Sequence, residues 1–173
     1  MMFKRIKLRL RDIRTIGKLI PGADEEAHMM GEEEPGAEHF LLSALKLPDG
    51  TAHRVFERVG ASPEQFKDAI KKQYSDALNA IGIDTKIIED DPEPVTSSRV
   101  LHNSKPSGQA VIKKLYALKR HDKDRPLLGA HVVDVVARME HGVAARAFKA
   151  MGIDQNVILS VVKEELDSFS NKL

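Results

Sequence analysis

Two stretches of this chain, 92 residues apart, repeat the same residues in the same order. The segment Gly50–Gly60 returns as Gly142–Gly152, with Gly, Ala, Arg, Phe and Gly at matching positions. Slightly upstream, Gly36-Ala37 returns as Gly129-Ala130 at an offset of 93, so a one-residue slip separates the landmarks. Internal repetition constrains a fold strongly, because each copy has to form the same structural unit. We therefore expect one unit to occur twice, and neither copy carries catalytic machinery.

Composition excludes several classes of protein. With 173 residues the chain is long enough to bury a core without covalent staples. The absence of cysteine excludes disulfides, thiolate metal sites and cysteine nucleophiles, and it is compatible with a reducing cytoplasm. Aromatic residues make up only 5%, which argues against base-stacking platforms for single-stranded nucleic acid. No apolar run approaches the ~18 residues that span a bilayer. We expect a cytoplasmic protein without a membrane segment.

The spacing of apolar residues predicts helices nearly throughout, and hence an all-α fold. Ser62-Pro63-Glu64-Gln65 has the residue types of a capping box with proline at the first helical position, so a helix should follow it. The predicted organisation has a first repeat over residues 1–83, which opens with a basic helix over 1–18. An acidic linker rich in proline and serine follows over 84–106, and a second repeat covers 107–173. The two repeats together should form one compact domain.

The N-terminal segment has two interpretations. Its apolar residues fall three or four apart, as on a helix, but Ile6, Leu8 and Leu10 also alternate with basic residues, so a short strand is an alternative. Gly17 and then Pro21-Gly22 interrupt the pattern. We therefore expect a separate second helix over residues 23–30.

Several motifs in the first copy resemble the amino-terminal domain of Clp unfoldases, and the ClpC kind most closely. They are Glu25-Glu26-Ala27, Gly36-Ala37-Glu38-His39 followed by a leucine-rich helix, Gly50-Thr51-Ala52, and the closing Gly60. The family reads Glu-Glu-Ala, then Gly-Thr-Glu-His, then Gly-x-Ala-Ala and a closing Gly, and it carries the unit twice. The resemblance covers nearly the whole chain, although the second copy rests mainly on Gly142–Gly152.

The resemblance implies two tandem four-helix repeats packed with pseudo-twofold symmetry. It also implies a non-catalytic docking module that binds substrates, adaptors or regulatory ligands of a Clp protease, with the Clp unfoldase itself as a further candidate partner. No phosphate-binding loop of the Gly-x-x-x-x-Gly-Lys-Ser/Thr type is present, so we expect either a stand-alone relative or a fragment. No cofactor is implied.

Departures from the family motif affect the expected site. The motif threonine is Ala37 in the first copy and Ala130 in the second, and Glu38-His39 becomes His131-Val132 under the one-residue slip. In ClpC-type relatives the motif glutamate lies in a pocket for phosphorylated arginine, and a carboxylate pairs well with a guanidinium group. Glu38 retains that capacity, whereas His131 does not. The insertion around Pro21-Gly22 should also break or displace the first helix.

The candidate sites are therefore sites of binding. Glu38-His39 has no third group to orient it for catalysis, and the seven histidines lack a metal-binding spacing, so no catalytic or metal residue is predicted. The predicted ligand- or peptide-binding residues are Phe3, Gly36, Ala37, Glu38, His39, Gly129, Ala130 and His131.

A basic N-terminal patch is the second candidate. It consists of Lys4, Arg5, Lys7, Arg9, Arg11 and Arg14. We expect these cations to face the acidic region Glu25–Glu38, and nucleic acid is an unlikely partner. The alternative function is binding of nucleic acid or another anionic surface through this patch. The sequence leaves the oligomeric state open.

Overall fold

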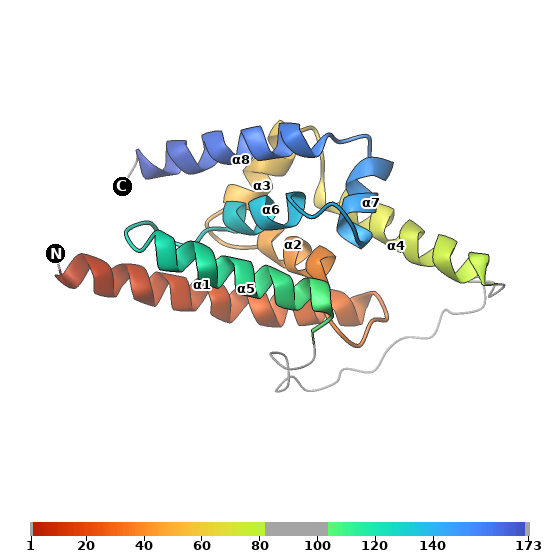
Figure 1. Ribbon diagram of the computed structural model, residues 1–173, viewed down its shortest axis with the longest axis horizontal. Helices are drawn as coiled ribbons and strands as arrows, with labels where there is room; N and C mark the ends of the chain where they lie inside the picture. Colours follow the sequence, from red (N-terminus) through yellow and green to blue (C-terminus); the bar gives the residue numbers. More distant parts are fainter. Residues whose placement is uncertain (1, 82–103, 172–173) are drawn as a thin grey trace.

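The computed structural model describes residues 2–81 and 104–171, with side chains described from Ile6 onward. Within these residues the chain forms eight helices and no strand (Figure 1). The predicted all-α class is confirmed, and most of the predicted linker 84–106 lies outside the described residues. The helices are α1 Met2–Met29, α2 Ala37–Leu45, α3 Thr51–Arg58, α4 Pro63–Ala80, α5 Pro106–His121, α6 Gly129–Ala137, α7 Val143–Ala150 and α8 Gln155–Ser170.

The repeat has one register throughout. Helices α2, α3 and α4 begin at residues 37, 51 and 63, and α6, α7 and α8 begin at 129, 143 and 155, always 92 residues later. The predicted one-residue slip is therefore wrong. Gly36-Ala37 matches Gly129-Ala130 only as a common pair of small residues, and the structural counterparts of Gly36 and Glu38 are Leu128 and Ala130.

Two short helices form the centre of the fold. Every residue of α2 is buried, as are seven of the nine residues of α6, and the two helices pack against each other. A Cβ at Gly129 would lie 3.0 Å from Ala52 Cβ and 3.1 Å from the Ala44 carbonyl oxygen. Residue 129 therefore has to remain small for the start of α6 to approach the first repeat this closely.

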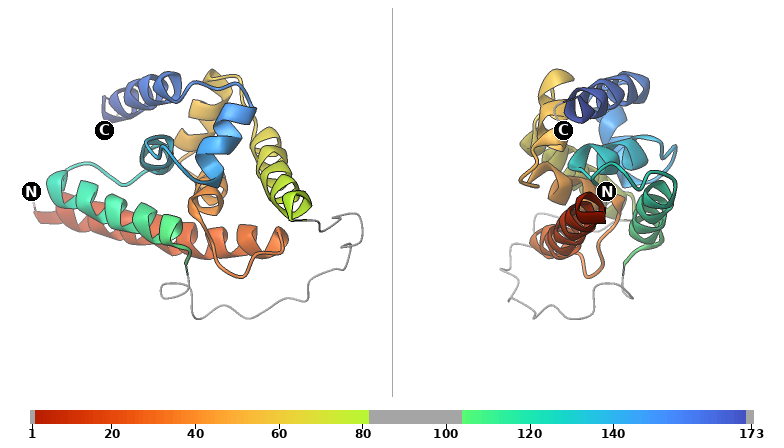
Figure 2. Two further views of the ribbon diagram at one scale, coloured as in Figure 1. Left: turned by 45° about the vertical axis from the view of Figure 1, so that its right-hand side comes forward. Right: turned by 90° about the vertical axis from the view of Figure 1, so that its left-hand side faces the viewer.

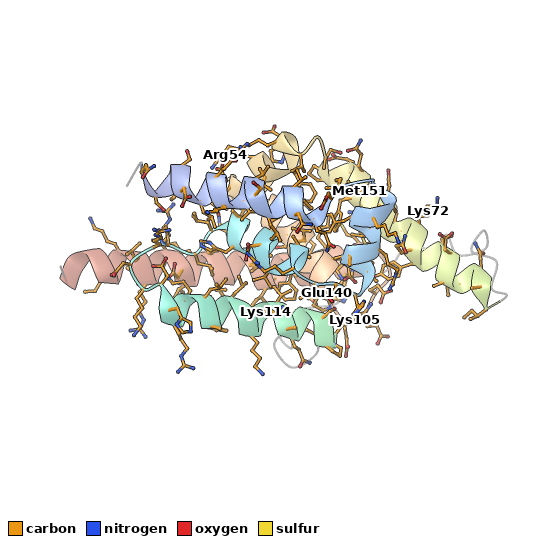
Figure 3. All side chains as sticks on the ribbon, turned by 45° about the horizontal axis from the view of Figure 1, so that its top comes forward. Arg54, Lys72, Lys105, Lys114, Glu140 and Met151 are labelled. Atoms are coloured by element: carbon orange, nitrogen blue, oxygen red, sulfur yellow. The ribbon has the colours of Figure 1, made fainter. Side chains whose placement is uncertain are left out.

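The two halves exchange helices around this centre. Helix α8 packs on α3, and α4 packs on α7 in the equivalent way. Arg54 Nε donates to Glu165 at 2.6 Å, and its counterpart Arg146 donates to Gln73, the residue equivalent to Glu165, at 3.2 Å. Arg54 lies beside α8 in Figure 3. These equivalent contacts are the expected signature of pseudo-twofold packing.

An aromatic cluster fills the space between the exchanged helices. The repeated phenylalanines Phe56 and Phe148 are both buried, with ring centroids 6.4 Å apart. Phe66, on the helix that the Ser62 capping box begins, lies 5.7 Å from Phe56 and 5.1 Å from Phe148. Aromatic contacts at these separations add to the stabilisation from burial. Both repeats thus contribute to one hydrophobic core.

Helix α1 is continuous, which corrects three expectations. It runs unbroken through Pro21, so residues 6–11 are not a strand, 23–30 is not a separate helix and the first helix is not broken. Proline inside a helix costs about 3 kcal/mol. Burial of Leu19 and Ile20 against α2 stabilises the fold by about 1.5–3 kcal/mol for each side chain, and this gain offsets the cost of the proline. A Cβ at Gly22 would lie 2.3 Å from Ser43 Oγ, so this glycine lets α1 approach α2.

We expect Phe148→Ala to lower the free energy of unfolding by about 3–5 kcal/mol, because the deletion leaves a cavity where the two repeats meet. Urea denaturation followed by circular dichroism measures this loss. Phe169→Ala is the matched control, because Phe169 lies near the end of α8 and is only partly buried. Equal losses in the two variants would contradict the placement of Phe148 in a shared core.

Candidate functional site

The start of α2 holds the predicted residues of the first copy, and most of its polar groups are bonded within the chain, whereas His39 Nε2 is buried and has no hydrogen-bond partner among the described residues. His39 Nδ1 accepts from the backbone N–H of Gly36 at 2.9 Å, which caps the helix. Glu38 is 2% exposed, and its carboxylate accepts from the Tyr74 hydroxyl at 2.6 Å. Burial and the neighbouring Glu38 carboxylate raise the pKa of Tyr74, so this hydroxyl keeps its proton. Tyr74 is thus the hydrogen-bond partner of the Glu38 carboxylate.

The start of α6 has the same cap. His131 Nδ1 accepts from the backbone N–H of Leu128 at 3.0 Å, so His131 corresponds to His39. The N–H groups at the start of the helix donate to Asp49 and Thr51 of the first repeat. Gly129 N lies 3.2 Å from Asp49 Oδ2, and Ala130 N lies 2.8 Å from Thr51 Oγ1. An external anion would have to displace both acceptors.

The buried pair of the first copy is replaced as a unit in the second. At the 92-residue offset, Glu38 corresponds to Ala130, and Tyr74 corresponds to Leu166, which packs against the core. Losing one partner of a buried hydrogen bond leaves an unsatisfied polar group, whereas replacing both by apolar groups is nearly neutral. The joint replacement indicates that Glu38 and Tyr74 serve as each other's partner.

The predicted binding residues are therefore not presented to solvent. Gly36, Ala37, Glu38, His39, Gly129 and Ala130 are buried, and His131 is half-buried. The side chain of Phe3 lies outside the described residues. The structure does not bring these residues together into one open site.

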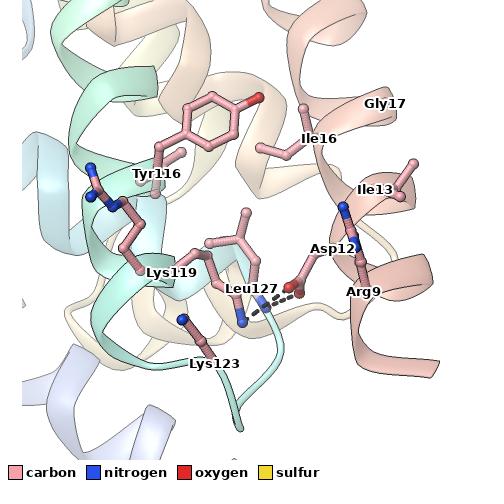
Figure 4. Close-up of a pocket in the computed structure, with 11 residues that line it drawn as sticks. Arg9, Asp12, Ile13, Ile16, Gly17, Tyr116, Lys119, Lys123 and Leu127 are labelled. Atoms are coloured by element: carbon pink, nitrogen blue, oxygen red, sulfur yellow. Dashed lines mark hydrogen bonds and ion pairs between the residues drawn. The ribbon is translucent and has the colours of Figure 1, made fainter. Parts of the chain in front are cut away.

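An open groove lies elsewhere, between α1 and α5. The two helices run antiparallel, and both pack on α2 (Figure 2). The cavity between them has a volume of about 890 Å³. Its apolar lining consists of Ile13, Ile16, Leu115, Tyr116 and Leu127. In Figure 4 the Tyr116 ring extends from α5 toward Ile16. We refer to this cavity as the α1–α5 groove.

The apolar surface of the groove is unusually open. Ile13 and Tyr116 are 60% and 54% exposed. Leu10, one turn before Ile13, is also exposed. A contiguous apolar surface of this kind marks an interaction site more often than a scatter of single residues does.

The rim of the groove is charged, and at one end of the groove the segment after α5 is bonded to α1. Asp12 accepts from the Leu127 backbone N–H at 2.7 Å and pairs with Lys119 at 3.0 Å. Thr15 Oγ1 donates to the Leu127 carbonyl at 3.2 Å. These contacts hold the segment after α5 against α1. The other charged lining residues are Arg9, Arg120 and Lys123.

The basic patch lies partly in this groove. Arg9 lines it, Lys7 and Arg14 are exposed on the same helix, and Arg11 stacks over the Phe169 ring at 5.2 Å. The side chains of Lys4 and Arg5 lie outside the described residues.

The expectation that the patch faces the acidic region is wrong, because the patch lies in the N-terminal half of α1, whereas the acidic residues lie at the C-terminal end of α1, in the loop after it and at the start of α2. Glu26 pairs instead with Lys46 and Lys67, and Glu32 pairs with Lys105. Burial alone would raise the pKa of Glu26, but the ammonium groups of Lys46 and Lys67 lower it below its ordinary value.

Sequence reasoning missed the contribution of α5 to the groove. Helix α5 carries more apolar residues than one buried stripe requires: Val111 and Leu115 are buried, while Tyr116 and Leu118 are exposed. The sequence therefore contains a signal for an open apolar surface on α5. Whether this surface forms a groove depends on the position of α1, which a local pattern does not reveal.

In residues 2–81 and 104–171, no three or more His, Asp or Glu side chains are arranged to hold a metal ion. Over the same part of the chain, none of the helices combines the length and apolarity needed to cross a bilayer.

Comparison with known families agrees with the helical architecture. Residues 15–94 match the family model of the Clp repeat (R) N-terminal domain. The matched part of the chain is similar to a Clp N-terminal repeat domain. The crystal structure of the N-terminal domain of the caseinolytic protease associated chaperone ClpD from Arabidopsis thaliana superimposes with a TM-score of 0.58. The match covers 91% of this chain and 92% of that one at 18% identity, so it establishes the Clp N-terminal fold.

The chain spans only a small part of the curated relatives that it matches. Chaperone protein ClpC1, chloroplastic, from Oryza sativa subsp. japonica is 34% identical over 58 residues, which are 34% of this chain and 6% of the relative. The chloroplastic ClpA homolog of Brassica napus, named as an ATP-dependent Clp protease ATP-binding subunit, is 26% identical over 154 residues. These are 81% of this chain and 16% of the relative. Clp N-terminal domains are themselves non-catalytic and bind proteins in Clp systems.

The two capping histidines predict a pH dependence of stability. Burial lowers the pKa of both His39 and His131, so the unfolded chain takes up protons at a pH where the folded chain does not. Stability should be full above the unfolded pKa of about 6.5 and fall as pH decreases below it, by at most about 1.4 kcal/mol per pH unit for each histidine.

Urea unfolding between neutral and mildly acidic pH tests this dependence. The double variant His39→Gln/His131→Gln keeps an acceptor at each cap but cannot titrate, so its stability should fall less steeply. His121→Gln, at an exposed position, is the control and should retain the wild-type slope. Equal slopes in the wild type and the double variant would refute the role of the caps.

Proposed function

We propose that this protein is a non-catalytic docking module that binds a segment of a protein substrate or adaptor of a Clp protease system. The observation that carries the proposal is the open α1–α5 groove, with its apolar lining and exposed Ile13 and Tyr116. The kinship with Clp N-terminal domains supports the same class of partner. The Clp unfoldase itself, and a cytoplasmic location, remain predictions.

The dimensions of the groove favour a polypeptide segment as the ligand. A volume of about 890 Å³ accommodates several side chains and is at the upper end of the range for small-molecule sites. Its walls are two antiparallel helices, a surface into which an amphipathic segment can lay its apolar side. Tyr116, a large and rigid side chain, is the type of residue that contributes most to such contacts.

The α2 start is a weaker candidate for the docking surface. The carboxylate that a guanidinium ligand would require is buried and bound to Tyr74. Recognition of phosphorylated arginine by Glu38 would compete with the part-buried hydrogen bond from Tyr74. We therefore assign docking to the α1–α5 groove, and recognition through Glu38 stays a prediction.

We expect the double variant Ile13→Ser/Tyr116→Ser to weaken binding of fluorescein-labelled unfolded casein at least about tenfold, equivalent to about 1.4 kcal/mol. Fluorescence anisotropy gives the dissociation constants. Leu118→Ser/Val157→Ser is the matched control, since both residues are exposed apolar side chains outside the groove lining. The proposal fails if the wild type does not bind casein, or if the control variant loses as much affinity as the groove variant.

Binding of an anionic surface through the basic patch is the second candidate. It is favoured by the exposure of Lys7, Arg9 and Arg14, for which the described residues provide no ion-pair partner. We expect salt-dependent retention on heparin that decreases in Lys7→Ala/Arg14→Ala, because each phosphate or sulfate contact releases counterions. Retention that is independent of salt would exclude this function.

A further inference from the structure

The charge of the groove is out of proportion to the charge of the chain. The whole protein has a formal net charge of +1. The groove lining has four cations and one carboxylate, and that carboxylate, Asp12, is already engaged by Lys119 and the Leu127 N–H. The groove therefore carries an uncompensated positive charge next to an exposed apolar surface.

Three of the four cations are available to a ligand. Arg9, Arg120 and Lys123 are exposed, and no ion pair involving them occurs among residues 2–81 and 104–171. They come from α1, from the last turn of α5 and from the segment after α5, so they surround the apolar lining. Lys123 and Arg9 lie on opposite sides of the groove in Figure 4.

A second hollow in the molecule does not share this charge imbalance. It has a volume of about 390 Å³ and lies beside α7 and the start of α8. Its cations Arg146 and Lys149 are matched by the carboxylates Glu140 and Asp154. A charged rim alone does not select the sign of a ligand, but a rim with an excess of one sign does.

We propose that the α1–α5 groove selects acidic peptide segments, in which apolar side chains contact Ile13 and Tyr116 while neighbouring Asp or Glu side chains pair with the cations of the rim. This inference rests on the proposed docking function and specifies its ligand. Arginine forms bidentate pairs with carboxylates, so Arg9 and Arg120 contribute geometry as well as charge. A peptide with basic residues beside the same apolar side chains is repelled.

The apolar lining distinguishes this ligand from a nucleic acid. A nucleic-acid backbone presents phosphates and sugars, and these polar groups gain no binding energy from an exposed isoleucine beside the cations. Sequence-tolerant binding of single strands relies on several aromatic stacking surfaces, whereas Tyr116 is the one aromatic side chain among the groove-lining residues described. The combination of cations and aliphatic surface fits a peptide that is both acidic and apolar.

The experiment compares three fluorescein-labelled peptides that share the same Leu and Phe residues and differ only in their flanking residues, which are Glu, Ser or Lys. We expect the Glu peptide to bind about tenfold more tightly than the Ser peptide at low ionic strength and the Lys peptide to bind most weakly. The preference should shrink in high salt, because the paired groups are exposed. Anisotropy titrations provide the dissociation constants.

Charge reversal tests whether the groove is responsible. In Arg120→Glu/Lys123→Glu the order of the three peptides should invert, while Lys71→Glu/Lys72→Glu on α4 should keep the wild-type order. Both variants alter exposed lysine or arginine residues and change the net charge equally. Unchanged urea midpoints establish that both variants are folded.

The outcomes separate this inference from the function on which it rests. If Glu and Ser peptides bind equally and Ile13→Ser/Tyr116→Ser abolishes both, groove docking stands and the acidic preference is refuted. If none of the peptides binds, the docking function itself fails. If a single-stranded oligonucleotide binds more tightly than the Glu peptide and loses its affinity in Arg120→Glu/Lys123→Glu, the ligand class is nucleic acid and the inference is overturned.

Discussion

The contact between α2 and α6 supports the rest of the structure. Both helices are short and nearly devoid of exposed surface, so neither is stable without the other. Gly129 allows the close approach, and the first repeat supplies the acceptors Asp49 and Thr51 for the N–H groups at the start of α6. Burial drives this contact, while the capping groups determine its register, because buried polar groups need partners at specific positions.

The two copies have diverged around a conserved frame. The capping histidines, the repeated phenylalanines and the α3–α8 and α4–α7 contacts are equivalent in both halves. By contrast, α1 has a long N-terminal extension that α5 lacks. Residues of this extension line the α1–α5 groove, so the groove has no symmetric counterpart among the described residues. Function in this molecule is therefore expected at the asymmetric features and not at the duplicated motif that first attracts attention.

Local sequence patterns predicted the structure correctly where a few neighbouring residues form hydrogen bonds with one another. The capping box is an example, since Gln65 N donates to Ser62 Oγ and Ser62 N donates to Gln65 as the sequence predicts. They failed at Pro21, where contacts with α2 outweigh the local cost of proline in a helix. They also failed for Glu38, because its hydrogen-bond partner, Tyr74, is 36 positions away.

The amino-acid sequence alone determined the helical class, the duplication and the absence of cysteine chemistry, because these depend on composition and on periodicity over a few turns. It also contained the Clp-like motif that the comparisons bear out. Only the tertiary structure decided that α1 continues through Pro21, that Glu38 is enclosed and that the open surface lies between α1 and α5. Each of these outcomes depends on free energy gained between segments far apart in the chain, which no local pattern encodes.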